Sequence, residues 1–401
     1  MTSLTRENVE TVALRAGLLN SGEKIVRYEL EPYSESKAGI LGQHQLLRVQ
    51  ISDQTRTSAT HKSFFVKSLS DESTAIAQLM DGIFIEETHF FDKVLTTLSR
   101  TCRHEKWLPT CYLVQPKQLV FEDLRAQGFS IRESFPLNET DIRSALSSLA
   151  ELHAYSLMFE GQSSKKLTEI FPNAFKERVF TSGHKYGEII ALGFKTIELM
   201  ARKLGLDSNL VPEIMRRVYE SVRPAKDARV PNVICHSDLW KNNLMFDQSQ
   251  PPKCVLVDFQ LLRYASPSID VGMLLYINST PDFRKKMESQ MIEHYYEALR
   301  HAISRSDAEI VLPSCEALKE DWQKRRIVGM TYACMYLPGH YLKKEKSDLL
   351  MNDPKILEKW LFKDRFGLIS KAIDEDPIYK ERMTAIVSDL IEEEKHLSLA
   401  V

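Results

Sequence analysis

The chain has 401 residues, of which 43% are hydrophobic and 27% are charged, and its formal net charge is -2. This ordinary globular mix is long enough for two lobes, and its near neutrality gives no general attraction for nucleic acid. No apolar run approaches the roughly 18 residues of a membrane span, and residues 1–22 lack the apolar region of a secretory signal. The six cysteines form no CxxC pair, so we expect reduced thiols and a cytoplasmic protein.

The front of the chain predicts a small sheet. Four segments have the residues typical of strands: 46–51, 63–69, 111–115 and 119–123. The last two flank Pro116-Lys117, which predicts a hairpin.

Segment 73–99 predicts one long helix, because its apolar residues recur with a period near 3.6. Glu87 lies within the apolar stripe, whereas Glu86 lies off it and is expected to be solvated. A carboxylate on a buried face is costly unless it is paired. Lys67, at the end of the apolar strand, is the nearest plausible cation in sequence, and such a lysine–glutamate pair holds the ATP phosphates in kinases. Alternatively, Glu87 reaches water from the margin of the stripe and Lys67 is a surface lysine.

After Leu124 the pattern becomes mostly helical. Segment 140–158 is the clearest amphipathic helix, and further helices are predicted at 210–222, 284–304, 316–335 and 378–398. A strand-rich front followed by a helix-rich rear predicts an α+β protein in two parts. We expect an ATP-binding lobe of residues 1–123 and a catalytic, acceptor-binding lobe of residues 124–401.

Two stretches, VICHSDLWKNNLMF at 233–246 and KCVLVDFQ at 253–260, carry the candidate chemistry. They contain two short apolar strands around a turn at 247–252. An antiparallel hairpin with that turn brings Asn243 and Asp258 to the same end, with Asp238 in the loop just before it.

These residue types match phosphoryl transfer. Asp238 is suited to orient an attacking hydroxyl and accept its proton, and we expect it to keep a near-normal carboxylate character. Asn243 and Asp258 offer the oxygen ligands that Mg²⁺ prefers. His-x-Asp alone and Asp-Phe after a strand are both common by chance. Their joint order after Lys67 and Glu87 is specific.

With these motifs the chain resembles the ecdysteroid kinase-like family, within the aminoglycoside phosphotransferase and choline kinase superfamily. The carrying residues are His236-Ser237-Asp238-Leu239-Trp240, Asn242-Asn243, Val257-Asp258-Phe259-Gln260, Ser266-Pro267 and Asp270, with Phe65-Val66-Lys67, Glu122-Asp123-Leu124 and Leu152-His153-Ala154 upstream. The resemblance extends from about residue 37 to beyond 275. Protein kinases differ, because they have Arg after the His and Gly after Asp-Phe.

The resemblance implies a bilobal protein-kinase-like fold with a small strand-rich lobe and a larger helical lobe. ATP would lie in the cleft, with its adenine against the segment from Glu122 to Leu124. His236 and Asp270 would brace the catalytic loop. The implied acceptor is a small-molecule hydroxyl, such as that of an ecdysteroid, with choline, ethanolamine or a xenobiotic alcohol as rivals.

Two departures from the family pattern concern the backbone. Ser237 stands where many relatives have Gly, and a small hydroxyl residue should be tolerated. Segment 37–44 contains Gly39 and Gly42 but no GxGxxG motif. These glycines either let backbone N–H groups approach phosphates or mark a plain turn.

Several side chains have two interpretations. Tyr332, Met335 and Tyr336 either line an acceptor pocket or pack between helices. Tyr264 and Ser266 are better placed to touch an acceptor because they follow Asp258 closely in sequence.

Other features fit structural roles. His153, on an apolar helix face, is expected to be a satisfied core histidine. Trp322 to Arg326 predict a solvated helix face.

A catalytically inactive nucleotide- or ligand-binding protein is the alternative from another class. It is disfavoured because Lys67, Asp238, Asn243 and Asp258 are all present. Protein-kinase activity is disfavoured because no Ala-Pro-Glu segment follows Asp258. The sequence leaves the oligomeric state open.

Overall fold

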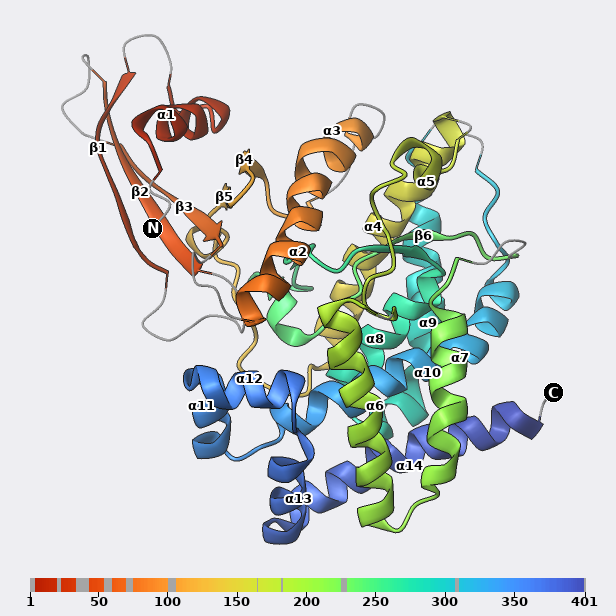
Figure 1. Ribbon diagram of the computed structural model, residues 1–401. Helices are drawn as coiled ribbons and strands as arrows, with labels where there is room; N and C mark the ends of the chain where they lie inside the picture. The colour runs from red at the N-terminus through yellow and green to blue at the C-terminus, as the bar shows by residue number, and fades with distance from the viewer. Residues whose placement is uncertain are drawn as a thin grey trace.

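The computed structural model describes residues 4–19, 23–33, 43–53, 60–69, 75–99, 106–163, 165–181, 183–224, 229–306 and 310–399. Figure 1 shows a small strand-rich part beside a larger body made mostly of helices. This confirms the predicted α+β, two-lobed class. The predicted division after residue 123 lies next to the end of the last strand of the sheet, and it stays a prediction.

The small lobe is built on an antiparallel sheet in the order β1-β2-β3-β5-β4. Its strands are β1 (Glu23–Pro32), β2 (Gln43–Asp53), β3 (Thr60–Ser68), β4 (Cys111–Gln115) and β5 (Gln118–Glu122). The sequence predicted β2 to β5, including the turn between the last two. It did not predict β1, an edge strand in which Ile25 is the single buried side chain, so the alternation of apolar residues is weak.

The helices of the small lobe pack in two directions. Helix α1 (Arg6–Arg15) buries Val9 and Val12 in one cluster with Leu47 and Phe64 of the sheet. The predicted long helix consists of α2 (Ala75–His89), the π-helical turn η1 (Phe90–Val94) and α3 (Leu95–Leu98). Its buried side chains join the core of the helical lobe. This long helix therefore links the two lobes.

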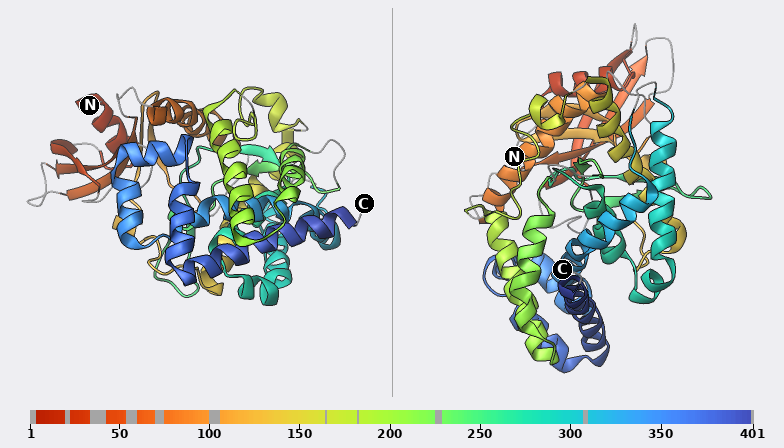
Figure 2. Two further views of the ribbon diagram at one scale, coloured as in Figure 1. Left: turned by 60° about the horizontal axis from the view of Figure 1, so that its bottom comes forward. Right: turned by 90° about the vertical axis from the view of Figure 1, so that its right-hand side faces the viewer.

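The larger lobe contains the remaining elements. Its longer helices are α4 (Glu139–Ser163), α6 (Lys185–Leu204), α7 (Val211–Ser221), α8 (Pro267–Asn278), α9 (Pro281–Ile303), α10 (Cys315–His340) and α14 (Pro377–Leu399). Its shorter helical segments are η2 (Arg125–Gln127), α5 (Leu167–Ile170), η3 (Ser208–Leu210), η4 (Lys241–Asn243), α11 (Lys344–Asn352), α12 (Pro354–Phe362) and α13 (Phe366–Glu375). Figure 2 shows α6 and α14 side by side at the base of this lobe.

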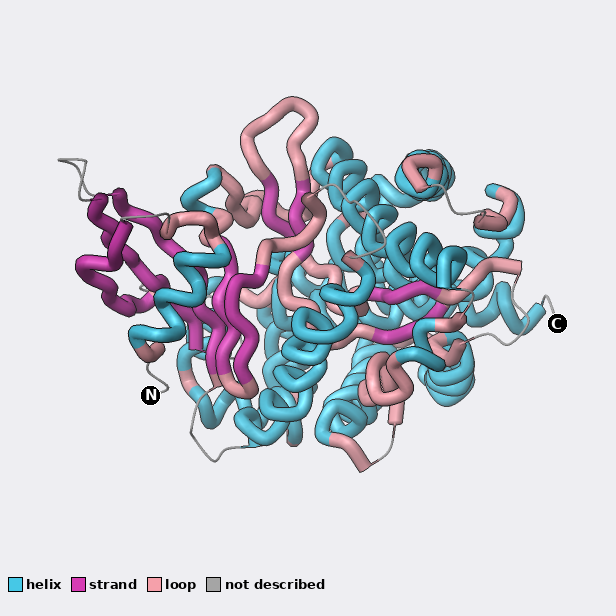
Figure 3. The backbone as a smooth tube through the Cα atoms, turned by 90° about the horizontal axis from the view of Figure 1, so that it is seen from above, coloured by secondary structure: helices cyan, strands magenta, loops and turns pink. Residues whose placement is uncertain are grey.

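Two short strand pairs lie within the helical lobe, apart from the main sheet (Figure 3). They are β6 (Val233–Cys235) with β9 (Arg263–Ala265), and β7 (Leu244–Phe246) with β8 (Cys254–Leu256). In the second pair Leu244 lies opposite Leu256, which confirms the predicted hairpin.

The sequence did not predict helix α8. All of its residues are buried, so its sequence lacks the polar face that produces a helical period. It packs closely against α10, where the two helices meet at Gly272 and Gly329. Trp322 is buried beside this contact, and Arg326 forms ion pairs with Glu288 and Glu393. The predicted solvated face is therefore confirmed for Gln323 and Lys324, which are exposed, and wrong for Trp322, which packs against α8.

In the described part of the chain, no helix is long and apolar enough to cross a membrane. The cysteines of this part are free thiols: Cys111, Cys235, Cys254, Cys315 and Cys334.

Replacing Gly329 by Ala tests the α8–α10 contact. An added Cβ would lie 2.4 Å from the backbone carbonyl carbon of Gly272, which cannot move aside as a side chain can. We expect Gly329→Ala to lower the free energy of unfolding by about 2–3 kcal/mol, measured by urea denaturation. Gly272→Ala is the control, because its Cβ would meet its nearest neighbour at 3.5 Å, an ordinary contact. Equal stability of both variants would contradict the close approach.

Candidate active site

A buried ionic network joins the two lobes at Lys67. Its Nζ atom donates to Glu87 Oε2 at 2.5 Å and to Asp258 Oδ1 at 2.6 Å. The side chains of Lys67 and Glu87 are 5% and 1% exposed. Burial alone would lower the pKa of Lys67, but Asp258 and Glu87 outweigh it and raise that pKa above its ordinary value. The predicted pair is confirmed, and both acidic partners keep the lysine charged.

The neighbouring Glu86 does not behave as predicted. It forms an ion pair with Arg178, and its side chain is only 11% exposed. The expectation of a solvated charge fails because α2 lies between the sheet and the helical lobe, so more than one of its faces is covered.

Phe259 fixes the position of Asp258. Its ring is fully buried and stacks on Phe90 with ring centres 5.1 Å apart, and it also contacts Trp107. Its backbone N–H donates to Glu87 Oε1 at 3.0 Å. Asp258 itself has a φ of 72°, in the left-handed region that few side chains adopt. This anchoring turns the carboxylate of Asp258 toward Lys67.

The carboxylate of Asp238 is held at both oxygens. Asn243 Nδ2 donates to Asp238 Oδ2 at 2.9 Å, and the Tyr336 hydroxyl donates to Asp238 Oδ1 at 2.8 Å. Asn243 Nδ2 also donates to the backbone oxygen of Asp238. Both hydrogen bonds from the Asn243 amide nitrogen therefore go to Asp238. The side-chain carbonyl oxygen of Asn243 remains available to bind a metal ion.

The pKa of Asp238 is raised to about 7. Burial is the main cause and the negative charge of Asp258 adds to it, while the donors on Tyr336 and Asn243 lower it. The expected near-normal carboxylate character is therefore wrong, because the side chain is buried. A pKa near neutrality suits a group that accepts and returns a proton.

Asp270 organises the backbone of the catalytic loop. Its carboxylate accepts from the backbone N–H of His236 at 2.5 Å and of Ser237 at 2.9 Å. The ring of His236 contacts the backbone oxygen of Val257 through Nε2 at 3.0 Å. These bonds tie the loop before Asp238 to α8 and to the strand before Asp258. They support the bracing role expected for His236 and Asp270.

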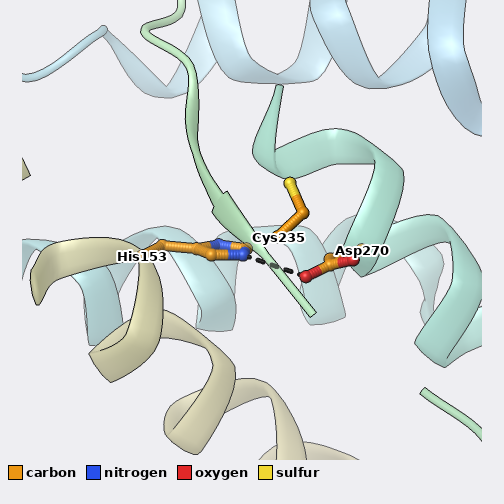
Figure 4. A group of neighbouring side chains, drawn as sticks. All are labelled: His153, Cys235 and Asp270. Carbon is orange, nitrogen blue, oxygen red and sulfur yellow. Dashed lines mark hydrogen bonds and ion pairs between the residues drawn. The ribbon is translucent and has the colours of Figure 1, made fainter. Parts of the chain in front are cut away.

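His153, Cys235 and Asp270 lie close together and could be mistaken for a metal centre (Figure 4). His153 contacts Tyr295 through Nδ1 at 2.7 Å and Asp270 through Nε2 at 3.3 Å. Burial raises the pKa of the Cys235 thiol well above its ordinary value, and the thiol donates to backbone carbonyls. A protonated thiol is a poor ligand. We interpret the group as core structure, as expected for His153.

The segment that joins the lobes contains a carboxylate held by several donors and an apolar side chain. Glu122 accepts from Lys106 at 2.8 Å, from Gln127 at 2.6 Å and from the backbone N–H of Thr110 at 2.7 Å. Leu124 belongs to a buried apolar cluster with Phe129, Met245, Val255 and, at its margin, Val257. Glu122 therefore braces the segment, and Leu124 supplies an apolar surface suited to an adenine ring.

A single cavity of about 570 Å³ connects these groups. One part is lined by Lys67, Leu124, Asp238, Asn243 and Asp258. The cavity continues between helices α6, α10, α11 and α12 of the larger lobe. Gly39 and Gly42 lie outside the described residues.

The continuation of the cavity is lined by Tyr332, Met335 and Tyr336, for which the sequence left two interpretations open. Trp360 and Arg365, which the sequence did not single out, line it as well. Tyr332 and Tyr336 are four residues apart and share a helix face, but only the packing reveals that this face meets the cavity. Helices α11 to α13 were not predicted, so no signal pointed to Trp360 or Arg365.

Tyr264 and Ser266 do not face the cavity, contrary to expectation. Both are buried; the Tyr264 hydroxyl donates to Glu160, and the Ser266 hydroxyl donates to Asp321. Tyr264 lies in β9, which pairs with β6 in the core, and Ser266 follows as the N-cap of α8. Proximity in sequence was misleading here.

The cavity lies between helices, which suits a small molecule better than a protein chain. Fold and site therefore have a kinase-like arrangement: a strand-rich lobe, a helical lobe, and the ion pairs of Lys67 with Glu87 and Asp258 that join them. The more particular assignment is to a family: the chain belongs to the ecdysteroid kinase-like family, whose profile matches residues 44–307.

The chain is also similar to individual proteins. A 4-hydroxytryptamine kinase from Psilocybe cyanescens is 30% identical over 101 residues, which span 24% of this chain and about a quarter (27%) of that protein. A choline kinase structure from Cryptosporidium parvum has a TM-score of 0.46 and 12% identity, covering 98% of this chain and 96% of its own. An ethanolamine kinase structure from Plasmodium vivax has a TM-score of 0.40 and 11% identity, and the match covers 94% of this chain and 91% of the ethanolamine kinase chain. Structural likeness at these scores decides nothing about function.

Ser237 offers a test of the loop geometry. Its φ is 66°, and its buried hydroxyl has no hydrogen-bond partner among the described residues. We expect Ser237→Gly to raise the free energy of unfolding by about 1 kcal/mol, because Gly adopts this conformation without strain. Ser237→Ala removes the same hydroxyl but keeps the strain, so it should gain less. The free energy of unfolding of both variants is measured by chemical denaturation. A gain in Ser237→Gly no larger than that in Ser237→Ala would show that the backbone at this position is not strained.

Proposed function

We propose that this protein transfers the γ-phosphate of ATP, with Mg²⁺, to a hydroxyl group of a small molecule. The observation that carries the proposal is the meeting of Lys67, Asp238, Asn243 and Asp258 at one cavity that continues among helices. The first part of that cavity has groups for a nucleotide, and the second part has room for an acceptor. The family assignment supports the same reaction class.

In the proposed reaction the acceptor hydroxyl lies next to Asp238. Its oxygen forms a bond to the γ-phosphorus while its proton passes to the carboxylate of Asp238. The bond from that phosphorus to the bridging oxygen breaks, and ADP leaves. Tyr336 and Asn243 keep the carboxylate in place, because each donates to one of its oxygens. Lys67 supplies positive charge to the phosphates.

Asn243 and Asp258 fit the needs of a magnesium site. The free carbonyl of Asn243 and the carboxylate of Asp258 are hard oxygen ligands, and phosphates and water complete the coordination. The side chain of Asp258 is 29% exposed, the most accessible of the Lys67 network. Bound Mg²⁺ would neutralise negative charge on the phosphates. The adenine would lie against Leu124.

We propose a hydroxylated lipophile as the acceptor, of which an ecdysteroid is one example. The acceptor part of the cavity has many apolar side chains: Ile189, Ile190, Leu350, Met351, Leu357, Trp360 and Leu361. Choline, ethanolamine or hydroxytryptamine would bring a positive charge that needs a carboxylate or an aromatic cage. Aromatic rings are present, but the buried Arg365 lines the same space and would repel a cation.

The proposal is tested with isotope-labelled ATP and a mixed metabolite extract, read by mass spectrometry. A labelled product that requires Asp238 establishes the kinase and reveals its acceptor. If wild type and Asp238→Asn give the same products, the protein is better described as an inactive nucleotide- or ligand-binding member of the fold.

Substitutions of Asp238 and Asp258 should have different effects on catalysis and on nucleotide binding. Asp238→Asn should lower kcat by roughly 100- to 10,000-fold, because it removes the proton acceptor. It should leave binding of magnesium with a non-hydrolysable ATP analogue nearly unchanged. Asp258→Ala should weaken that binding by roughly tenfold or more, because it removes a magnesium ligand. Isothermal titration separates the cases, and equal loss of binding in both variants would contradict the assigned roles.

Tyr336 should control the pH dependence. Its hydroxyl lowers the pKa of Asp238, so Tyr336→Phe should raise that pKa above about 7. Asp238 accepts a proton only when ionised, so the acidic limb of the kcat/KM profile should move up by about one pH unit. Activity should fall at pH 7 and recover near pH 9. Tyr332→Phe is the control, because the Tyr332 hydroxyl bonds to Arg263 instead. An unmoved limb in Tyr336→Phe would count against the proposed proton acceptor.

A further inference from the structure

Arg365 is a buried cation in the acceptor part of the cavity. It lies between α12 and α13, is 5% exposed and lines the cavity. Burial lowers the pKa of its guanidinium to about 10, and Tyr336 acts in the opposite direction. The group therefore stays charged at neutral pH.

The bonds of Arg365 within the protein do not balance its charge. Its Nε donates to the backbone oxygen of Trp360 at 3.0 Å, and its Nη2 donates to that of Ile189 at 3.2 Å. No carboxylate of the described residues lies within ion-pair distance of it. A guanidinium has five N–H donors, and an uncompensated buried charge is unfavourable. Backbone carbonyls therefore hold the side chain in place but leave its charge without a counter-ion.

The acidic side chains of the cavity lie elsewhere. Within the described residues, the carboxylates that line it are Glu87, Glu122, Asp238 and Asp258. None of these comes from α6, α10, α11, α12 or the segment that carries Arg365. The acceptor part thus combines apolar walls with a positive charge from the protein.

Tyr336 relates Arg365 to the reacting end of the cavity. Both residues line the cavity, and the Tyr336 hydroxyl donates to Asp238 at 2.8 Å. An acceptor with its hydroxyl at Asp238 would extend past Tyr336 toward the guanidinium.

We propose that Arg365 selects acceptors that carry an anionic oxygen group, a carboxylate or a sulfate, at the end of an apolar skeleton opposite the reacting hydroxyl. The inference rests on the proposed kinase function and narrows its substrate class to hydroxylated lipophilic acids. The planar fork of a guanidinium matches the oxygens of such groups, and the charge pairing satisfies a cation that the protein itself leaves unpaired. A positively charged acceptor would be repelled at the same place.

The first experiment identifies the charge of the acceptor. Products that wild type, but not Asp238→Asn, forms from labelled ATP and a metabolite extract are dephosphorylated, and the released acceptor is analysed by electrophoresis at pH 7 and by accurate mass. An anionic acceptor is expected, and its mass tells a carboxylate from a sulfate. A neutral or cationic acceptor overturns the inference and leaves the kinase function standing. Absence of any such product overturns the kinase function, and the inference with it.

The second experiment tests Arg365 on the acceptor so found. Arg365→Gln keeps amide donors for the two backbone carbonyls but removes the charge. It should raise KM for the acceptor roughly tenfold or more with little change in kcat or in KM for ATP. The control is Lys363→Gln, which removes an exposed charge two residues away and should change neither constant. An unchanged acceptor KM in Arg365→Gln, or an equal rise in both Michaelis constants, would mean that Arg365 only braces α12 against α6.

Discussion

The positive charge of Lys67 is the constraint on which the rest of the structure depends. A buried ammonium must be paired, and its two partners come from different lobes: Glu87 from the helix α2 and Asp258 from the loop after β8. The pairing fixes how the sheet, the long helix and the catalytic hairpin approach one another. It also explains why Glu87 lies on an otherwise apolar helix face, where Phe259 supplies a further donor.

Around this network, buried polar groups hold an unusual backbone in place. Ser237 and Asp258 both have positive φ, and each lies beside a fixed anchor. Asp270 accepts the backbone N–H groups that precede Asp238, and the buried ring of Phe259 holds the residue after Asp258. The strained backbone presents both aspartates to the same cavity, while the anchors are provided by the core of the helical lobe.

The sequence by itself determined the fold class and the grouping of most of the charged residues at one end of the cavity. Strand and helix periodicity separated a strand-rich front from a helical rear, and local spacing placed Asn243 and Asp258 at one end of a hairpin. The pairing of Lys67 with Glu87 was accessible because a carboxylate on an apolar stripe requires a partner. Each of these inferences depends either on residues close in sequence or on a buried charge, which requires a partner of opposite charge.

Only the tertiary structure decided which side chains line the other end of the cavity, where we propose that the acceptor binds. Tyr336 comes from α10 and Arg365 from the loop after α12, and both lie far beyond Asp238 in sequence. No local pattern predicts that they line the same cavity as Asp238. The raised pKa of Asp238 also depends on burial by distant elements. Conversely, Tyr264 is near Asp258 in sequence but faces the core, because β9 pairs with β6. Helix α8 lacked any periodic signal, since it is buried on all sides. Periodicity reports which face of one element avoids water, whereas a cavity is defined by which faces of several elements meet.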